Sequence, residues 1–298
     1  MAIGAVAAVI ACGGGGSSSS QLIWVPDSGG AVLAFSTDAS GNTAPQRMIQ
    51  GSSTTLNAPT AVARDADGYL YVSDFPTSQP GKVVVFAPDA NGDAVPVRTI
   101  SGSHTGIGHA MSLAIDGAGY VYVANRDEEN ITVYAPGASG DVAPVRTISA
   151  ASGTPWYPQQ LVVDPAGDLT VATLDQGILR FHAGASGEAT PAAWITDAKC
   201  AGVAVDAAGD LFCGYTSLMA FAPGADGNAT PLREVTGAKT QIQQGEGIAL
   251  LGTDVVFSDC GAQALLFFPQ SANGNVAPVR LISGAATLMT CPLRPSIL

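Results

Sequence analysis

Short apolar runs recur along the whole chain and are separated by clusters of Gly, Pro, Asp and Asn. Runs of this length, bounded by turn residues, are typical of β-strands. No stretch in the body of the chain keeps the spacing of an amphipathic helix. The pattern therefore predicts an all-β protein made of many short strands.

One cassette occurs six times, and each copy contains an apolar run, a small turn and a Pro-x-Arg-like stretch. The copies begin at Val32, Val83, Ile131, Ile178, Leu218 and Leu265. Their marker prolines are Pro45, Pro96, Pro144, Pro191, Pro231 and Pro278, spaced 51, 48, 47, 40 and 47 residues apart. A period in this range, made of short strands, predicts a radial array of repeated units.

A second motif lies between the cassettes and consists of two strand-like runs joined by an Asp-x-x-Gly turn, as in AVARDADGYLYVSD. Its copies cover 61–74, 112–125, 160–173, 202–215 and, in a degenerate form, 247–259. This hairpin supplies strands a and b, and the cassette supplies strands c and d, joined by turns such as Asn91-Gly92. Four antiparallel strands per repeat predict a propeller blade.

The two ends of the repeat array complement each other. Residues 22–27 match a strand b without its strand a, and residues 291–298 match a strand a without its strand b. We expect them to share one blade, which closes the ring and removes the exposed sheet edges. The prediction is one six-bladed β-propeller over 21–298, with four antiparallel strands per blade.

These residues resemble the NHL-type group of six-bladed propellers, which includes gluconolactonase-like and lyase-like members. The shared pattern is a gIAvD-x-x-G-x-lYVaD hairpin followed by an i-x-vF segment, over about residues 21–298. The resemblance implies the fold. It does not imply one function, because this group contains lactonases, lyases and pure binding modules.

Net charge limits the partners. The chain has 12 basic against 24 acidic residues, a net charge of −12. Five of the basic residues repeat at one cassette position and are therefore spread around the ring: Arg47, Arg98, Arg146, Arg233 and Arg280. Nucleic-acid binding needs clustered Lys and Arg, so it is not expected. We expect these arginines to bond neighbouring carbonyls or carboxylates.

The N-terminal segment has features of an export signal. Residues 1–12 are small and apolar and end at Cys12, and a Gly/Ser tether follows at 13–20. The segment resembles a bacterial lipoprotein signal peptide, which implies lipidation of Cys12 and a place in the cell envelope, at the outer membrane or cell surface. It departs from that pattern in its short apolar region and in having no Lys or Arg before it; an apolar tail with a chance Cys is the alternative.

Four further cysteines allow three disulfide pairings. Cys200 and Cys213 fall in one predicted blade, whereas Cys260 follows a strand b and Cys291 enters the closing strand of the next blade. This placement favours Cys200–Cys213 and Cys260–Cys291. In a reducing compartment the same residues would be free core cysteines.

Variable loops carry nearly all of the unusual polar and aromatic groups. They are the b–c and d–a loops, which lie on one face of a propeller, and function usually sits on such loops. Candidate binding residues are Asp74, Asn125, Trp156, Tyr157, Gln159 and Asp259. The aromatic pair could stack a sugar or peptide, although anchoring of the loop is the simpler role.

Resemblance to gluconolactonase-like propellers implies a metal alternative. Glu246, Asn125, Asp74 and Asp259 are suitable ligand types for a hard cation such as calcium, and His109 or Glu246 could act in catalysis. Against this, Asp or Asn after strand b commonly closes a turn by bonding local backbone.

We therefore expect an exported lipoprotein that acts as a monomeric binding scaffold, with no cofactor required. Its ligand would be a small molecule, glycan or peptide on the variable loop face, and its only membrane contact the lipid anchor. The alternative is a metal-assisted, lactonase-like hydrolase or lyase at the channel mouth. The identity of the ligand does not follow from the sequence.

Overall fold

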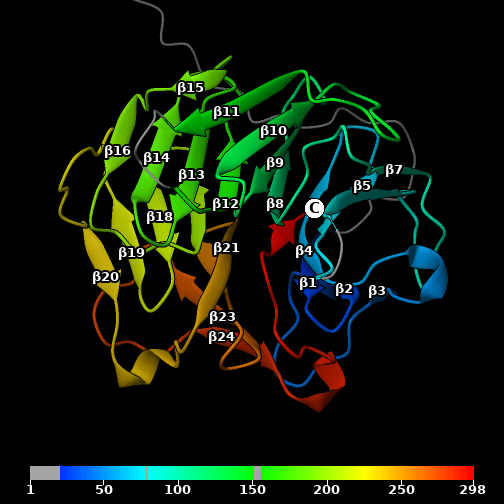
Figure 1. Cartoon of the computed structure of the whole chain (residues 1–298). Coiled ribbons are helices and arrows are strands. Elements are labelled where there is room, and N and C mark those ends of the chain that lie inside the picture. Colours follow the sequence, from blue (N-terminus) through cyan, green and yellow to red (C-terminus); the bar gives the residue numbers. More distant parts are fainter. Residues whose placement is uncertain (1–20, 78–79, 151–155) are drawn as a thin grey trace, which may run out of the picture.

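A computed structural model describes residues 21–77, 80–150 and 156–298. The predicted signal segment with Cys12 and the Gly/Ser tether lie outside these residues. Within them, six sheets that each contain four antiparallel strands are arranged as a ring (Figure 1), and one sheet gains a short fifth strand in parallel. The predicted six-bladed propeller is therefore confirmed. No helix in the described part of the chain is long and apolar enough to cross a membrane.

The blades follow chain order, each running from its inner strand a to its outer strand d. Blade 1 contains β25 (Ser296–Ile297), β1 (Leu22–Asp27), β2 (Ala31–Ser36) and β3 (Arg47–Ile49). Blade 2 contains β4 (Pro59–Arg64), β5 (Leu70–Asp74), β6 (Lys82–Phe86) and β7 (Arg98–Ile100). Blade 3 contains β8 (Ala110–Ile115), β9 (Val121–Asn125), β10 (Asn130–Tyr134) and β11 (Arg146–Ala150).

The other half of the ring repeats this order. Blade 4 contains β12 (Pro158–Val163), β13 (Leu169–Thr173), β14 (Gly177–Phe181) and β16 (Ala193–Ile195). Blade 5 contains β17 (Gly202–Val205), β18 (Leu211–Gly214), β19 (Leu218–Phe221) and β20 (Arg233–Val235). Blade 6 contains β21 (Gly245–Leu251), β22 (Asp254–Asp259), β23 (Ala264–Pro269) and β24 (Arg280–Ser283). Short 3₁₀ helices in three of the d–a loops are η1 (Ser52–Thr54), η2 (Ala238–Thr240) and η3 (Ala285–Thr287).

The hydrophobic core lies between the blades. Six clusters of buried residues each join two neighbouring blades; for example, Trp24 and Val32 of blade 1 pack in one cluster with Val72 and Phe86 of blade 2. Because a blade is covered on both faces, strands such as β5 and β9 are buried at every residue. This explains why they read as continuous apolar runs.

The recurrent cassette joins each blade to the one before it. The glycine of the c–d turn forms a parallel bridge to outer strand d of the preceding blade at all six interfaces. In blade 4 this contact extends into a short strand, β15 (Gly187–Ala189), against β11. At Gly92 the backbone takes a φ of 65°, which glycine adopts without a steric penalty. The glycine N–H donates to Met48 O at 2.6 Å, and Gln50 N–H donates to the glycine carbonyl at 3.0 Å.

Most of the repeated arginines reinforce this contact. Arg47, Arg146, Arg233 and Arg280 donate hydrogen bonds to backbone carbonyls of the following blade. Arg98 instead donates to the hydroxyl of Tyr71 in its own blade, at 2.7 Å. The cassette thus encodes contact between blades.

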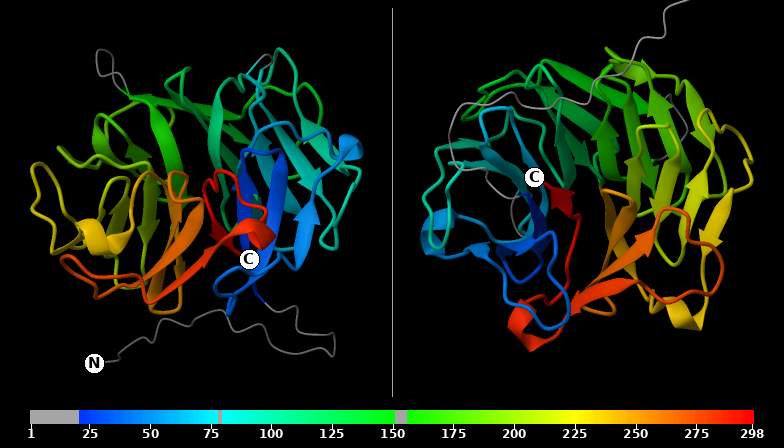
Figure 2. Two further views of the ribbon diagram at one scale, coloured as in Figure 1. Left: turned by 90° about the horizontal axis from the view of Figure 1, so that it is seen from below. Right: turned by 180° about the vertical axis from the view of Figure 1, so that it is seen from behind.

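The ring closes as the sequence predicts. β25 pairs antiparallel with β1, with Ile297 opposite Ile23 and Ser296 opposite Trp24. Figure 2 shows the C-terminal segment in red beside the blue first strands. Both favoured disulfides form: Cys200–Cys213 within blade 5, and Cys260–Cys291 between blade 6 and the closing segment. Two disulfides are typical of proteins in an oxidising, extracellular compartment.

Candidate functional site

The two strand-b carboxylates among the candidates hold loops of their own blades. Asp74 is fully buried, and its Oδ1 accepts hydrogen bonds from Asn57 N–H at 2.9 Å and Ala58 N–H at 2.7 Å. Asp259 is equally buried and accepts from Gln243 N–H at 2.7 Å and Gln244 N–H at 3.1 Å. Each carboxylate therefore fixes the d–a loop that leads into its inner strand.

Asp27, at the same position of blade 1, bonds the N–H groups of Thr290 and Cys291 in the same way. In blade 3, Asn125 accepts from Gly108 N–H at 3.3 Å and donates to Asn130 Oδ1 and Thr132 Oγ1 at 3.0 Å each. These side chains thus bond backbone groups of their own blades, although their d–a loop partners are distant in sequence and not in the local turn.

The four candidate metal ligands are not brought together. Glu246 is half-buried, and its Oε1 accepts from Gln244 Nε2 at 2.8 Å. Among the described residues, no group of three or more His, Cys, Asp or Glu side chains has the arrangement of a metal site.

His109 lies at the edge of a hollow of ≈ 390 Å³ on the b–c loop face. Its Nδ1 is 2.9 Å from Asp127 Oδ2, and its ring stacks on Phe75 with the ring centroids 3.8 Å apart. Its backbone N–H donates to Glu128 Oε2 at 2.8 Å. The imidazole therefore contacts one carboxylate, that of Asp127, and one aromatic ring, whereas Glu128 holds the backbone of the same residue.

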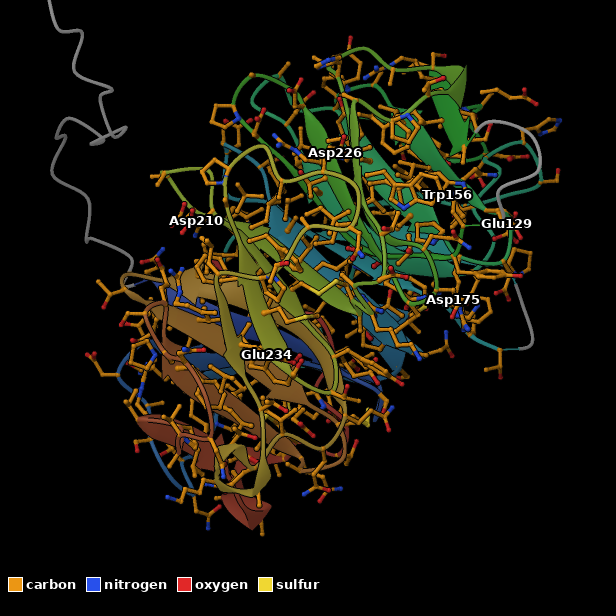
Figure 3. All side chains as sticks on the ribbon, turned by 90° about the vertical axis from the view of Figure 1, so that its left-hand side faces the viewer. Glu129, Trp156, Asp175, Asp210, Asp226 and Glu234 are labelled. Atoms are coloured by element: carbon orange, nitrogen blue, oxygen red, sulfur yellow. A yellow bond between two sulfur atoms is a disulfide. The ribbon has the colours of Figure 1, made fainter. Side chains whose placement is uncertain are left out.

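The aromatic pair divides into a buried and a half-buried residue. Trp156 is 1% exposed, and its indole N–H donates to the backbone carbonyl of Glu129 at 2.5 Å (Figure 3). Its ring packs against Phe181, so it anchors blade 4 to blade 3. Tyr157 is half-buried, and its carbonyl accepts from Gln159 Nε2 at 3.3 Å.

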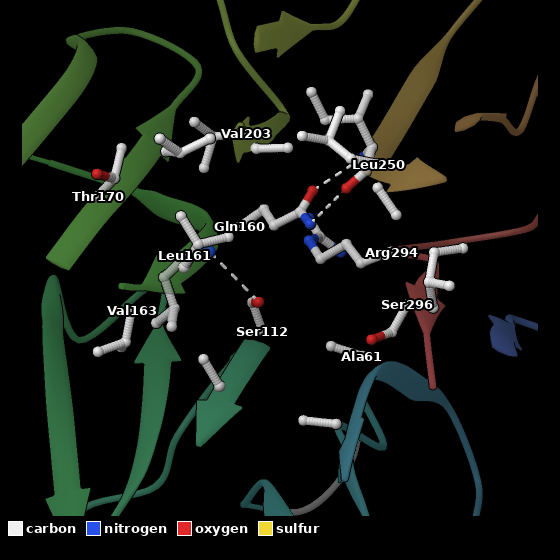
Figure 4. A pocket seen from close by; sticks show the side chains of 18 of the residues that line it. Ala61, Ser112, Gln160, Leu161, Val163, Thr170, Val203, Leu250, Arg294 and Ser296 are labelled. Atoms are coloured by element: carbon white, nitrogen blue, oxygen red, sulfur yellow. Dashed lines mark hydrogen bonds between the residues drawn. The ribbon is translucent and has the colours of Figure 1, made fainter. Parts of the chain in front are cut away.

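The propeller channel itself forms a cavity of ≈ 570 Å³ (Figure 4). Residues from all six inner strands line it, most of them aliphatic, including Leu113, Val203 and Leu250. Its lining continues into the a–b turns at Asp164 and Asp206 and includes no residue of a b–c loop. From the d–a connections it includes Arg294 and Pro295, which lead directly into β25. The cavity therefore opens away from the variable loop face on which the sequence places the binding residues.

Two long polar side chains form the floor of this cavity. Gln160 crosses to blade 6, where its Nε2 donates to Ile248 O at 2.9 Å and its Oε1 accepts from Ile248 N–H at 3.0 Å. Arg294 reaches in from the C-terminal segment beside it (Figure 4), and its Nη2 donates to Gln159 Oε1 at 3.0 Å. Burial lowers the pKa of the Arg294 guanidinium to about 10.

Sequence reasoning missed both floor residues. Gln160 lies in a recognised strand a, and Arg294 lies in the recognised closing segment. A comparison of the equivalent strand-a position in each of the six blades could have found them, because Gln160 and Arg294 are the only long side chains at that position.

Fold and channel together define the class: a closed six-bladed β-propeller with a cavity along its axis. The sequence matches no family model and no curated protein. Among solved structures, the chain is similar to one from the complex of nidogen with laminin, with a TM-score of 0.64, 13% identity, and coverage of 93% of this chain and 98% of that one. It is also similar to a candidate 6-phosphogluconolactonase from Bacteroides fragilis, with a TM-score of 0.55, 13% identity, and coverage of 96% and 100%. At this identity the likeness shows the fold alone.

Proposed function

We propose that this chain is a lipid-anchored propeller of the bacterial cell envelope that binds a small molecule in its channel and catalyses no reaction. The observation that carries the proposal is the ≈ 570 Å³ axial cavity, which is aliphatic along its walls and polar at its floor. Ligand sites in proteins are typically concave, mostly apolar and furnished with a few polar groups. The NHL-type resemblance remains a prediction within this proposal.

The lactonase-like alternative has weaker support. It needs Asp74, Asp259, Asn125 and Glu246 to converge on a cation, whereas the contacts of the first three are to loops of their own blades. The binding role uses the cavity without requiring these side chains to leave their partners.

A matched pair of variants tests channel binding. Ala114 is half-buried and lines the cavity, so Ala114→Leu narrows it. Ala118 lies in the a–b turn of the same blade, is exposed, and is outside the cavity lining, so Ala118→Leu is the control. A thermal-shift screen of small molecules should find compounds that stabilise the wild type and Ala118→Leu but not Ala114→Leu.

Two outcomes would overturn the channel proposal. One is a set of stabilising compounds that act equally on both variants. The other is hydrolysis of a lactone by the wild type that is lost in His109→Ala, which would move the function to the b–c loop face.

The lipid anchor has its own test, because Cys12 is the residue that would carry it. Full-length wild type expressed in a bacterium should partition into the detergent phase of Triton X-114, and Cys12→Ser should remain in the aqueous phase. Equal partitioning of the two proteins would remove the anchor from the proposal and leave the binding module.

A further inference from the structure

The floor of the channel cavity is formed at one level of the six inner strands. Strand registers and the bridge between Ala61 and Arg294 put one residue of each blade at this level. These residues are Ala61, Ser112, Gln160, Gly202, Gly247 and Arg294. Four of them are small, and the other two reach across the space that the small ones leave.

The glycines at this level are required for that arrangement. A Cβ on Gly247 would lie 2.7 Å from Arg294 Cα, and a Cβ on Gly202 would lie 2.7 Å from Ile248 N, the group that Gln160 binds. Contacts this short do not occur between real atoms without a backbone shift. Small residues at this level therefore leave the channel axis to two side chains, the amide of Gln160 and the guanidinium of Arg294.

Arg294 is the member whose bonding is incomplete. It is 2% exposed, and its Nε and Nη1 have no hydrogen-bond partner in the described structure. None of the ion pairs in that part of the chain includes it. A buried charge without a partner costs several kcal/mol, so the site favours an anion.

Acidic groups near the cavity form no ion pair with Arg294 in the described residues. Glu246 attracts the guanidinium from the loop side, but its Oε1 is bonded to Gln244. Asp164 and Asp206 accept backbone N–H groups of their own turns at the cavity mouth. An external acid can therefore supply the charge that Arg294 lacks.

We propose that the channel cavity binds an organic monoanion, a carboxylate on an aliphatic body, with the carboxylate at Arg294 and the body against the aliphatic wall. This inference rests on the proposed binding function and names the ligand class. Charge-assisted hydrogen bonds to a carboxylate are the strong ones, and the wall residues Leu113, Val203, Ile248 and Leu250 match an alkyl chain. Because Nε and Nη1 are shielded in this structure, Arg294 must turn toward the cavity on binding.

Octanoate and octan-1-ol are the probes, because they share a chain and differ in charge. Calorimetric titration of the full chain should show octanoate binding at least about tenfold more tightly than the alcohol. Arg294→Met should abolish this preference. The variant is expected to fold, because an apolar side chain of similar length replaces an unpaired buried charge. Lys239→Met is the control: Lys239 is exposed and lies outside the cavity lining, so removing its charge should leave the preference unchanged.

The outcomes separate this inference from the proposed function. Equal binding of both probes, reduced by Ala114→Leu, would overturn the anion preference while leaving a channel-binding module. A preference that survives in Arg294→Met, or no binding of octanoate at all, would also overturn the inference. A crystal structure with octanoate should show Arg294 turned toward the carboxylate; a carboxylate bound elsewhere would contradict it.

Discussion

At the residue scale, the same side-chain type can bind a metal or hold a loop, and only its partners decide between these roles. Asp27, Asp74 and Asp259 stand at the ends of three equivalent strands, and all three accept hydrogen bonds from backbone N–H groups of the d–a loop. These partners lie in a different part of the blade, 15 or more residues away along the chain in each case. The sequence therefore indicates a polar group without identifying its role.

Asp74→Ala tests the loop-holding role. The change leaves two N–H groups of the d–a loop without their acceptor and removes the partner of Lys82, 3.5 Å away, so we expect a loss of about 2 kcal/mol of unfolding free energy. Urea unfolding should show the same loss of unfolding free energy in calcium and in EDTA. Asp74→Asn, which keeps one acceptor oxygen, should show a smaller loss. A loss seen only in calcium would favour a metal site instead.

Tyr134 predicts a dependence of stability on alkaline pH. The side chain is fully buried, its hydroxyl donates to Thr105 O at 2.5 Å, and burial raises its pKa to about 12. An unfolded tyrosine loses its proton near pH 10, so between about pH 10 and pH 12 the unfolded chain binds fewer protons than the folded one. Stability must fall as pH rises through this window, by up to about 2–3 kcal/mol from this residue.

The comparison is with Tyr134→Phe, which cannot ionise. Near neutral pH the variant should be less stable by about 1 kcal/mol, because Thr105 O loses its donor. The difference between the two proteins should shrink, then reverse, in urea unfolding at rising alkaline pH. A constant difference over the whole range would show that Tyr134 ionises as readily in the folded chain as in the unfolded one.

At the element scale, the cassette shows what a repeat can and cannot predict. Its apolar run, turn and Pro-x-Arg stretch predict strands c and d correctly, because these depend on local pattern. Its role between blades does not follow from that pattern. Gly92 and Arg47 each donate hydrogen bonds to backbone carbonyls of the other's blade, about 40 residues away in sequence. A hairpin turn, however, needs a glycine for its own geometry whether or not a neighbouring blade binds it.

Arg280 is the informative arginine, because it joins the last blade to the first. Its Nη1 donates to Thr37 O and Ala39 O, and its guanidinium carbon lies 3.7 Å from the centroid of the Phe267 ring. Arg280→Met keeps the apolar stem and should lower the unfolding free energy by about 2 kcal/mol. In the control Arg98→Met, the lost bond is to Tyr71 of the same blade, and the expected loss is about 1 kcal/mol. Equal losses would argue against a special role of the contact between blades.

At the scale of the whole molecule, the ring and its closure could be predicted because six copies define a common register. This register showed that residues 22–27 lack a strand a and that residues 291–298 lack a strand b. It also placed Cys260 beside Cys291. The cavity could not be predicted in this way. It depends on Gln160 and Arg294 crossing an axis shared by six strands, and side-chain reach across a ring is not a property of any one repeat. The variable b–c and d–a loops also pointed the prediction of a binding site to the face opposite the mouth of this cavity.

Closure predicts unequal contributions from the two disulfides. Cys260–Cys291 spans 31 residues and Cys200–Cys213 spans 13, so loop entropy gives about 4 kcal/mol for the first and about 3 kcal/mol for the second. The larger consequence is structural. Ile23 and Trp24 pair with β25, and backbone hydrogen bonds also join Leu22 to Leu298 and Pro26 to Leu293. Losing the Cys260–Cys291 bond removes the covalent link at the start of this segment and so loosens its cover over the edge of β1.

An uncovered strand edge pairs readily with another chain. Cys260→Ser/Cys291→Ser should therefore form dimers and larger species as concentration rises, measured by light scattering after size exclusion, whereas Cys200→Ser/Cys213→Ser should be destabilised but remain monomeric. If both double variants associate equally, the effect belongs to general unfolding and the terminal blade holds without its disulfide. If only the first associates, that disulfide keeps the edge of β1 covered, and the closed channel depends on it.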